Sequence, residues 1–178
     1  LKISLDRYVK EYWSLSGLGF TEKQINKLIL RGCSKNTVNA LISNFKSIKQ
    51  LDRDVMTHDV ITSMAARDGG GVALYALLKS FSALRVQPYG LTTSQIIRVV
   101  SNNGGSKNIE AVKKSFEELK DLQFDAEQIV KIVSHDGGSK NVEAVKSSFE
   151  PLNNLRFSAE QIVHMVNHDG GSNNIEAV

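Results

Sequence analysis

Apolar residues recur along this chain with the spacing of amphipathic helices. In the stretch 124–156 two sets show this spacing: Ile129, Ile132 and Val133, then Val142, Val145, Phe149 and Leu152. Gly137-Gly138 separates the two sets and marks a tight loop. Ser139 then stands where an N-cap residue belongs, as Ser106 and Ser172 do in similar stretches. The pattern predicts a short helix, a Gly-Gly loop and a longer helix.

The same pattern repeats through the chain. Two complete repeats of 33 residues occupy 91–123 and 124–156, and a third begins at Phe157 and stops at Val178. Over these last 22 residues, 16 match the repeat that starts at Phe124. Counting from Phe124 as position 1, position 26 is aromatic in every copy that reaches it: Tyr12, Phe45, Phe81, Phe116 and Phe149. We therefore expect degenerate repeats at 20–55 and 56–90, and the end of another at 1–19.

Neither helix of such a repeat can bury its apolar face alone, so neighbouring repeats must stack. The sequence therefore predicts an all-α fold, an α-solenoid of two-helix repeats. Its composition, 41% hydrophobic and 23% charged, is ordinary for a soluble globular protein. No run approaches the roughly 18 apolar residues of a membrane span, so we expect no membrane partner.

The single cysteine and the chain ends add two expectations. Cys33 alone excludes an internal disulfide and fits a reducing, intracellular compartment. A thiol nucleophile at Cys33 has no supporting His nearby in the sequence. Because the chain opens at Leu1 without a start Met and stops in mid-repeat, we expect a fragment of a longer array.

Charge is distributed unevenly along the chain, although the formal net charge is only +3. Residues 1–55 carry ten Lys/Arg against five Asp/Glu, whereas residues 157–178 carry three acids and no Lys/Arg. This asymmetry favours an anionic partner that is held mainly at the N-terminal end, and uneven solvation of the surface accounts for it equally well. The cations that we expect to contact a phosphate backbone are Lys23, Lys27, Arg31 and Lys35.

The two residues before Gly-Gly vary while the frame around them is constant. The matching segments read SNNGGSKNIEAV at 101–112, SHDGGSKNVEAV at 134–145 and NHDGGSNNIEAV at 167–178. In a superhelix with these loops on its inside, loop spacing can match the rise of about 3.4 Å per base. Asp accepts a hydrogen bond from the N4 amino group of cytosine, and Asn donates to N7 of a purine. The pair therefore suits the reading of one duplex base per repeat.

The rest of the loop suits a phosphate backbone. Glycines let the loop approach base edges closely, and N–H groups at the start of a helix can face a phosphate. We expect this of eight glycines: Gly69, Gly70, Gly104, Gly105, Gly137, Gly138, Gly170 and Gly171. Lys107 and Lys140, two residues after the second glycine, stand near the same phosphates.

Other interpretations of the loop compete with this one. A Gly-Gly turn between helices is by itself weak evidence of function. The His-Asp pairs lack a recurring third or fourth ligand, so we expect no metal or other cofactor. An active site need not be copied along an array, and Asn-Asn replaces His-Asp in one repeat, so we expect no enzyme and no small-molecule substrate. A protein-binding α-solenoid and a single-stranded RNA-binding repeat protein remain open as alternatives.

The three segments resemble the repeats of transcription activator-like effectors, in which a hypervariable pair precedes Gly-Gly at the same positions. The opening Leu91-Thr92 and the series Gln95, Gln128 and Gln161 also fit. The 33-residue length and the divergent flanks are more similar to the TALE-like outliers from a fungal endosymbiont and from marine metagenomes than to the plant-pathogen proteins. The resemblance is highly specific over 91–178 and weaker over 20–90.

The resemblance implies a right-handed superhelix that wraps duplex DNA as a monomer, in a bacterial cytoplasm or, for a secreted effector, a host nucleus. Residues 1–55 would be degenerate repeats that anchor the DNA backbone, and 56–178 the base-reading repeats. The first residue of each pair would brace the loop through a backbone carbonyl: Arg67, Asn102, His135 and His168. The second would meet the base: Asp68, Asn103, Asp136 and Asp169. The implied target core is 5′-C-(G/A)-C-C-3′.

Two stretches depart from the family pattern. Arg is not a usual brace, and Arg67 can pair with Asp68 and divert it from the base. The repeat 20–55 has lost its glycine pair and reads Arg31-Gly32-Cys33-Ser34, as in the family's degenerate N-terminal repeats. The family's Trp that prefers a leading thymine has no clear match, and we predict that Trp13 lies in the core instead.

Overall fold

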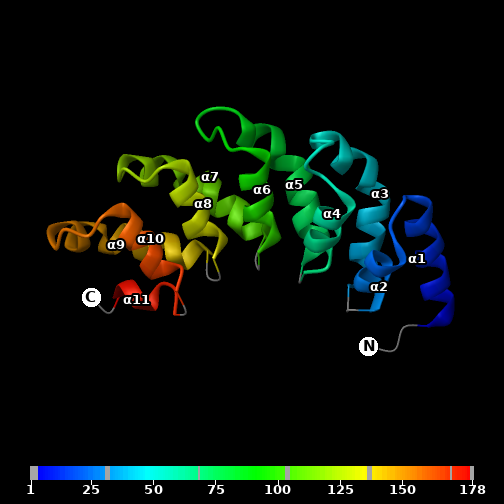
Figure 1. Ribbon diagram of the computed structural model, residues 1–178. Coiled ribbons are helices and arrows are strands. Elements are labelled where there is room, and N and C mark those ends of the chain that lie inside the picture. The colour runs from blue at the N-terminus through cyan, green and yellow to red at the C-terminus, as the bar shows by residue number, and fades with distance from the viewer. Residues whose placement is uncertain are drawn as a thin grey trace. The chain divides into compact units, whose positions relative to one another are not determined.

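The computed structural model describes residues 4–30, 33–67, 69–102, 105–135, 138–168 and 170–176 (Figure 1). These residues form eleven α-helices and no β-strand, which confirms the all-α class. They divide into two compact units, Leu1–Phe81 and Ser82–Val178. In the described part of the chain, no helix combines the length and hydrophobicity that a membrane crossing requires.

Short and long helices alternate in the order that the sequence predicts. The first unit contains α1 (Leu5–Gly17), α2 (Glu22–Leu30), α3 (Lys35–Leu51), α4 (His58–Ala65) and most of α5 (Gly70–Arg85). The second contains α6 (Thr93–Ser101), α7 (Gly105–Asp121), α8 (Ala126–Ser134), α9 (Gly138–Asn154), α10 (Ala159–Val166) and α11 (Asn173–Glu176). Within the second unit α6 contacts α8 and α8 contacts α10, while α7 contacts α9 and α9 contacts α11. Each helix pair therefore packs on the next one.

The predicted apolar positions form the core. At position 6, every isoleucine is at most 1% exposed: Ile25, Ile61, Ile96, Ile129 and Ile162. At position 29 the aliphatic side chains are equally buried: Leu15, Ile48, Leu84, Leu119 and Leu152. Burial of each such side chain contributes about 1.5–3 kcal/mol to stability. The spacing of these positions thus holds the two helices of each repeat in a constant register.

The first helices of three repeats begin at the same capping box. The side chains of Thr92, Asp125 and Ser158 accept hydrogen bonds from the amides of Gln95, Gln128 and Gln161. In return the glutamine Oε1 atoms accept from the three N-cap amides at 2.9, 2.9 and 2.8 Å. Two otherwise unpaired N–H groups are thereby satisfied at each helix start. The recurrent glutamine has a structural role within the helix.

The second helices begin earlier than the sequence predicts. α7 and α9 start at Gly105 and Gly138, so Ser106 and Ser139 lie inside the first turn and their prediction as N-caps was wrong. In α9 the amide of Gly138 already bonds the carbonyl of His135 at 3.0 Å, and this turn leads directly into the helix. Ser172 does immediately precede α11.

An asparagine joins the two helices of each repeat in the second unit, and it is buried in the two complete repeats. The Nδ2 atoms of Asn108, Asn141 and Asn174 donate to the main-chain carbonyls of Val99, Ile132 and Met165, at 3.2, 3.5 and 3.0 Å. Those carbonyls lie in the last turn of the first helix, where helical N–H groups do not reach them. Asn141 is only 1% exposed. These contacts explain the constant Asn that follows Gly-Gly-Ser-Lys and Gly-Gly-Ser-Asn.

Replacing Asn141 with alanine is expected to lower the free energy of unfolding by about 1–3 kcal/mol, because the Ile132 carbonyl is left without its buried partner. Equilibrium urea unfolding measures this change. Asn153→Ala is the matched control, since Asn153 is exposed near the end of α9, and it should change stability by less than about 0.5 kcal/mol. Equal destabilisation of the two variants would contradict a specific role for Asn141.

The prediction that Trp13 lies in the core was wrong, because its side chain is 69% exposed. Trp13 occupies position 27, one residue beyond the aromatic position 26. The other repeats carry exposed polar residues at position 27: Lys46, Ser82, Glu117 and Glu150. The indole packs edge-on against Tyr12, with ring centroids 5.8 Å apart. The buried residues of α1 are instead Glu11 and Leu15.

Candidate nucleic-acid interface

All four predicted base readers lie outside the described residues: Asp68, Asn103, Asp136 and Asp169. Arg31, Gly104 and Gly137 also lie outside them. The structure describes the loops through the residues that flank the readers. Those flanking residues include every predicted brace and the second glycine of each pair.

The amide of the second glycine is used inside the loop. Gly70, Gly138 and Gly171 donate to the carbonyls of Arg67, His135 and His168, at 2.9, 3.0 and 2.9 Å. Their N–H groups therefore already have a main-chain acceptor, three residues back at the brace. These three amides are engaged within the loop, so we expect other N–H groups at the start of the second helix to face a phosphate.

The glycines of the pair also have steric reasons to be glycine. A Cβ atom on Gly70 would lie 2.2 Å from the carbonyl oxygen of Ala65. On Gly138 it would lie 2.6 Å from the Val133 carbonyl oxygen and 2.4 Å from Oδ1 of Asn108 in the preceding repeat. The first glycine has a positive φ where it is described, +71° at Gly69 and +111° at Gly170, which favours glycine. Close packing at Gly70 and Gly138 and the positive φ of Gly69 and Gly170 thus favour glycine at these positions without any partner.

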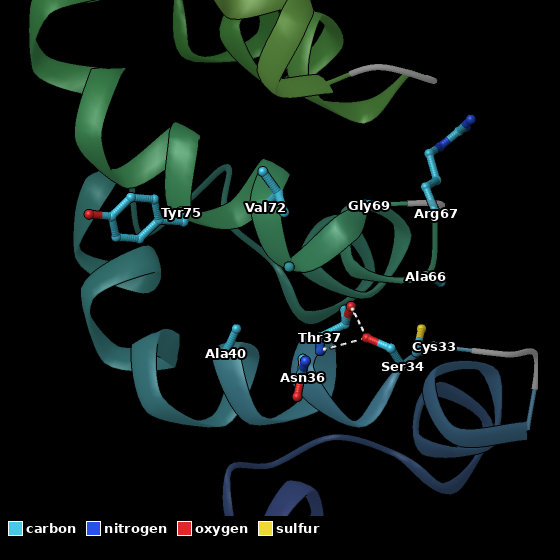
Figure 2. Close-up of a pocket in the computed structure, with 11 residues that line it drawn as sticks. Cys33, Ser34, Asn36, Thr37, Ala40, Ala66, Arg67, Gly69, Val72 and Tyr75 are labelled. Carbon is cyan, nitrogen blue, oxygen red and sulfur yellow. Dashed lines mark hydrogen bonds between the residues drawn. The ribbon is translucent and has the colours of Figure 1, made fainter.

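The predicted braces behave differently from one repeat to the next. Nδ2 of Asn102 donates to the main-chain carbonyl of Ser134 in the following repeat. The acceptor is a backbone carbonyl, but it lies in the next repeat, outside the loop that Asn102 is predicted to brace. Nε2 of His168 instead lies 2.9 Å from Nε2 of His164, and His135 is half-buried. Arg67 is exposed, and it is one of the residues that line the neighbouring cavity (Figure 2).

Basic and hydroxyl side chains gather along the first half of the second helices. Lys107 and Lys140 are both exposed in the first turns of α7 and α9. A groove of about 690 Å³ runs past Lys140 and also includes Lys114, Ser139, Ser172, Asn173, Glu143, Ala144 and Ser147. It therefore contains two cations and one carboxylate. The sequence prediction did not include Lys114. Position 24, where it stands, is also lysine in two other repeats, at Lys10 and Lys79.

Other cations of the second unit are held in ion pairs between consecutive repeats. Arg98 pairs with Glu127, and this contact lowers the pKa of the Glu127 carboxyl. Nζ of Lys146 lies 2.5 Å from Oε2 of Glu118, which lowers the pKa of Glu118 and raises that of Lys146. These pairs connect neighbouring repeats. Lys114 also lowers the pKa of Glu118, and the groove carboxylate Glu143 lies 3.9 Å from Nζ of Lys146, so the groove and the ion pairs adjoin.

The structure divides the predicted N-terminal cations into two sets. Lys23 and Lys27 lie together on α2 and line a groove of about 850 Å³ with Thr21, Glu22, Asn26 and Leu30. Lys35 lines a separate groove of about 450 Å³ that Asp6, Arg7, Lys10, Glu11, Ser14, Asn39 and Ile42 also border. Sequence reasoning missed Lys10, which lies far from Lys35 along the chain.

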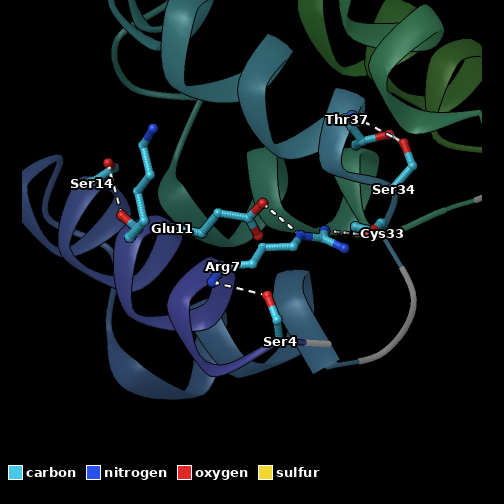
Figure 3. A network of polar contacts seen from close by, with 8 residues as sticks. Ser4, Arg7, Glu11, Ser14, Cys33, Ser34 and Thr37 are labelled. Carbon is cyan, nitrogen blue, oxygen red and sulfur yellow. Dashed lines mark hydrogen bonds and ion pairs between the residues drawn. The ribbon is translucent and has the colours of Figure 1, made fainter. Parts of the chain in front are cut away.

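Arg7 is less available to an outside anion than Lys10 or Lys35. Its Nε donates to Oε1 of Glu11 at 2.8 Å, and its Nη2 donates to the Cys33 carbonyl at 3.3 Å (Figure 3). Glu11 is 4% exposed, and its Oε2 has no hydrogen-bond partner within the described residues. Arg7 stands at position 21, where other repeats carry alanine. Glu11 stands at position 25, where they carry serine or asparagine.

Cys33 is a buried thiol in surroundings that disfavour the thiolate form. Its Sγ donates to the Ala65 carbonyl at 3.3 Å. Burial raises the pKa of the thiol, and nearby Glu11 raises it further. Cys33 lines a cavity of about 550 Å³ beside Thr37, Val72 and Tyr75 (Figure 2). Val72 and Tyr75 stand where complete repeats carry Lys and Glu, so the repeat 56–90 lacks the lysine of the second-helix start.

No protein-family model matches the chain, and a search of curated proteins finds no relative.

Proposed function

We propose that this chain binds double-stranded DNA sequence-specifically, as a right-handed superhelical α-solenoid that reads one base per repeat in the major groove. The observation that carries the proposal is the variable pair between a constant helix end and a constant Gly-Gly. Asn108 and Asn141 bind the two helices of their repeats to one another. Such constant contacts around a variable pair are expected if the helices set the distance between successive loops while the pair selects the base.

The charged surface supports a phosphate-bearing partner. Exposed Lys107 and Lys140 stand at equivalent places in consecutive repeats, close to the first turn of a helix. Lys114 and Lys140 border one groove with serine side chains, which can donate to phosphate oxygens. The cations of the first unit, Lys23 with Lys27 and Lys10 with Lys35, would supply sequence-independent grip.

A selection from randomised duplexes is expected to enrich 5′-C-(G/A)-C-C-3′, read in chain order by Asp68, Asn103, Asp136 and Asp169. The first cytosine should be the weakest position, because Arg67 can pair with Asp68. Fluorescence anisotropy then compares the selected duplex with a scrambled duplex, the matching single strand and RNA of the same sequence. Enrichment without any C-G-C-C or C-A-C-C core would contradict the proposed reading.

The same titrations separate the alternatives. A protein-binding scaffold would show no preference between the selected and scrambled duplexes. A single-stranded RNA reader would bind the RNA strand more tightly than the duplex. If the proposal is right, the selected duplex should bind most tightly at every salt concentration. Phosphate contacts weaken with salt for all duplexes alike, whereas base contacts still favour the selected sequence.

A further inference from the structure

The last repeat contains a contact between two histidines. His164 lies in the last turn of α10 and His168 lies four residues further on, and both are exposed. Their Nε2 atoms are 2.9 Å apart, and their rings meet edge to face with centroids 4.3 Å apart. Position 8, where His164 stands, is filled by other residue types in the other repeats: Lys27, Ser63, Arg98 and Lys131. The pair is therefore particular to this repeat.

This spacing matches that of two ligands on one metal ion. Imidazole nitrogens bind Zn²⁺ at about 2.0–2.1 Å, so two of them at a right angle lie about 2.9 Å apart and at a tetrahedral angle about 3.4 Å apart. A small rotation of either exposed ring can turn both nitrogens toward one point. Neutral imidazole suits borderline ions such as Zn²⁺, Ni²⁺ and Cu²⁺ better than Mg²⁺ or Ca²⁺.

We propose that His164 and His168 chelate a divalent transition-metal ion of this class. In the described part of the chain no third His, Cys, Asp or Glu joins them in a cluster. With two protein ligands among the described residues, the remaining coordination positions are open to water. Glu160, one turn before His164, lines a surface hollow together with His164 and adds a negative charge near the ion. The proposal goes beyond DNA reading and does not depend on it.

Isothermal titration of the untagged chain with Ni²⁺ alone tests the chelate. One ion should bind per chain, and binding should weaken as the pH falls because protons compete for the same nitrogens. His164→Lys copies the residue of Lys27 and Lys131, and His168→Asn copies Asn102. Each should lower the affinity at least about tenfold, because the second imidazole then no longer acts as an intramolecular ligand.

His135→Asn is the matched control, because His135 is the equivalent brace in a repeat that carries Lys131 at position 8. Its affinity for Ni²⁺ should equal that of the parent chain. Thermal unfolding without metal should be unchanged in the His164 and His168 variants, since both side chains are exposed. An equal drop in affinity for all three histidine variants, or no drop at His164 and His168, would overturn the proposed chelate.

Discussion

Replacing Lys23, Lys27, Arg31 and Lys35 with alanine is expected to weaken binding to every duplex alike. Removing one phosphate contact should flatten the plot of log affinity against log salt by roughly 0.9, and removing all four should flatten it by about 3.6. The ratio of affinities at 50 and 200 mM salt should then shrink by about 150-fold. Base preference should be retained, because phosphate contacts position a protein without reading sequence. Anisotropy titrations over this salt range measure both quantities.

The two grooves of the first unit allow a sharper version of this experiment. Lys23 and Lys27 can be removed as one pair, and Lys10 and Lys35 as another. Each double variant should flatten the salt slope by about 1.8 if both cations contact phosphates. The control removes Lys46 and Arg53, which are exposed and border neither groove.

The control double variant should change the salt slope little, although it removes the same charge. If it matches the groove variants, general positive charge holds the DNA and the grooves have no special role. An unchanged slope in both groove variants would mean that the N-terminal cations are not the anchor. A flatter slope in the groove variants alone would support backbone contacts by the degenerate repeats.

The helices and the core could be predicted because burial depends on spacing along a helix. Ile129 and Val145 recur at helical intervals, and both are fully buried. The start of the second helix could not be placed from the same pattern. Gly138 resembles a loop residue in the sequence, but its amide bonds the His135 carbonyl and its missing Cβ lets the chain pass close to Val133. Steric contact of this kind is not visible in a hydrophobic pattern.

The candidate site was less predictable, because its contacts cross between helices. Asn141 looks like a surface residue beside Lys140, yet it is buried against the end of α8. Lys10 joins the groove of Lys35 only because α1 and α3 pack together. The prediction for Trp13 was wrong because it relied on the aromatic character of the side chain, which suggested burial. Trp13 stands at position 27, and this position is exposed in every repeat that reaches it.

Changing Asp136 to Asn is expected to move the base preference of one repeat from cytosine toward a purine. The carboxylate accepts from the N4 amino group of cytosine, whereas the amide of Asn can donate to purine N7. One good base contact is worth about 1–3 kcal/mol, so discrimination at that position should change by about 5- to 150-fold. Preferences at the other positions should stay the same. Competition among duplexes that differ only at this base measures the change.

The fold should survive this substitution, because the described contacts around Asp136 use other groups. The neighbouring turn is closed by main-chain atoms of His135 and Gly138, and Asn141 bonds the end of α8. Asp121→Asn is the control for the removed charge, since Asp121 is exposed at the end of α7. It should leave base preference unchanged. If Asp136→Asn melts like the parent chain but still prefers cytosine, Asp136 is not the reader and one-residue, one-base recognition fails in this repeat.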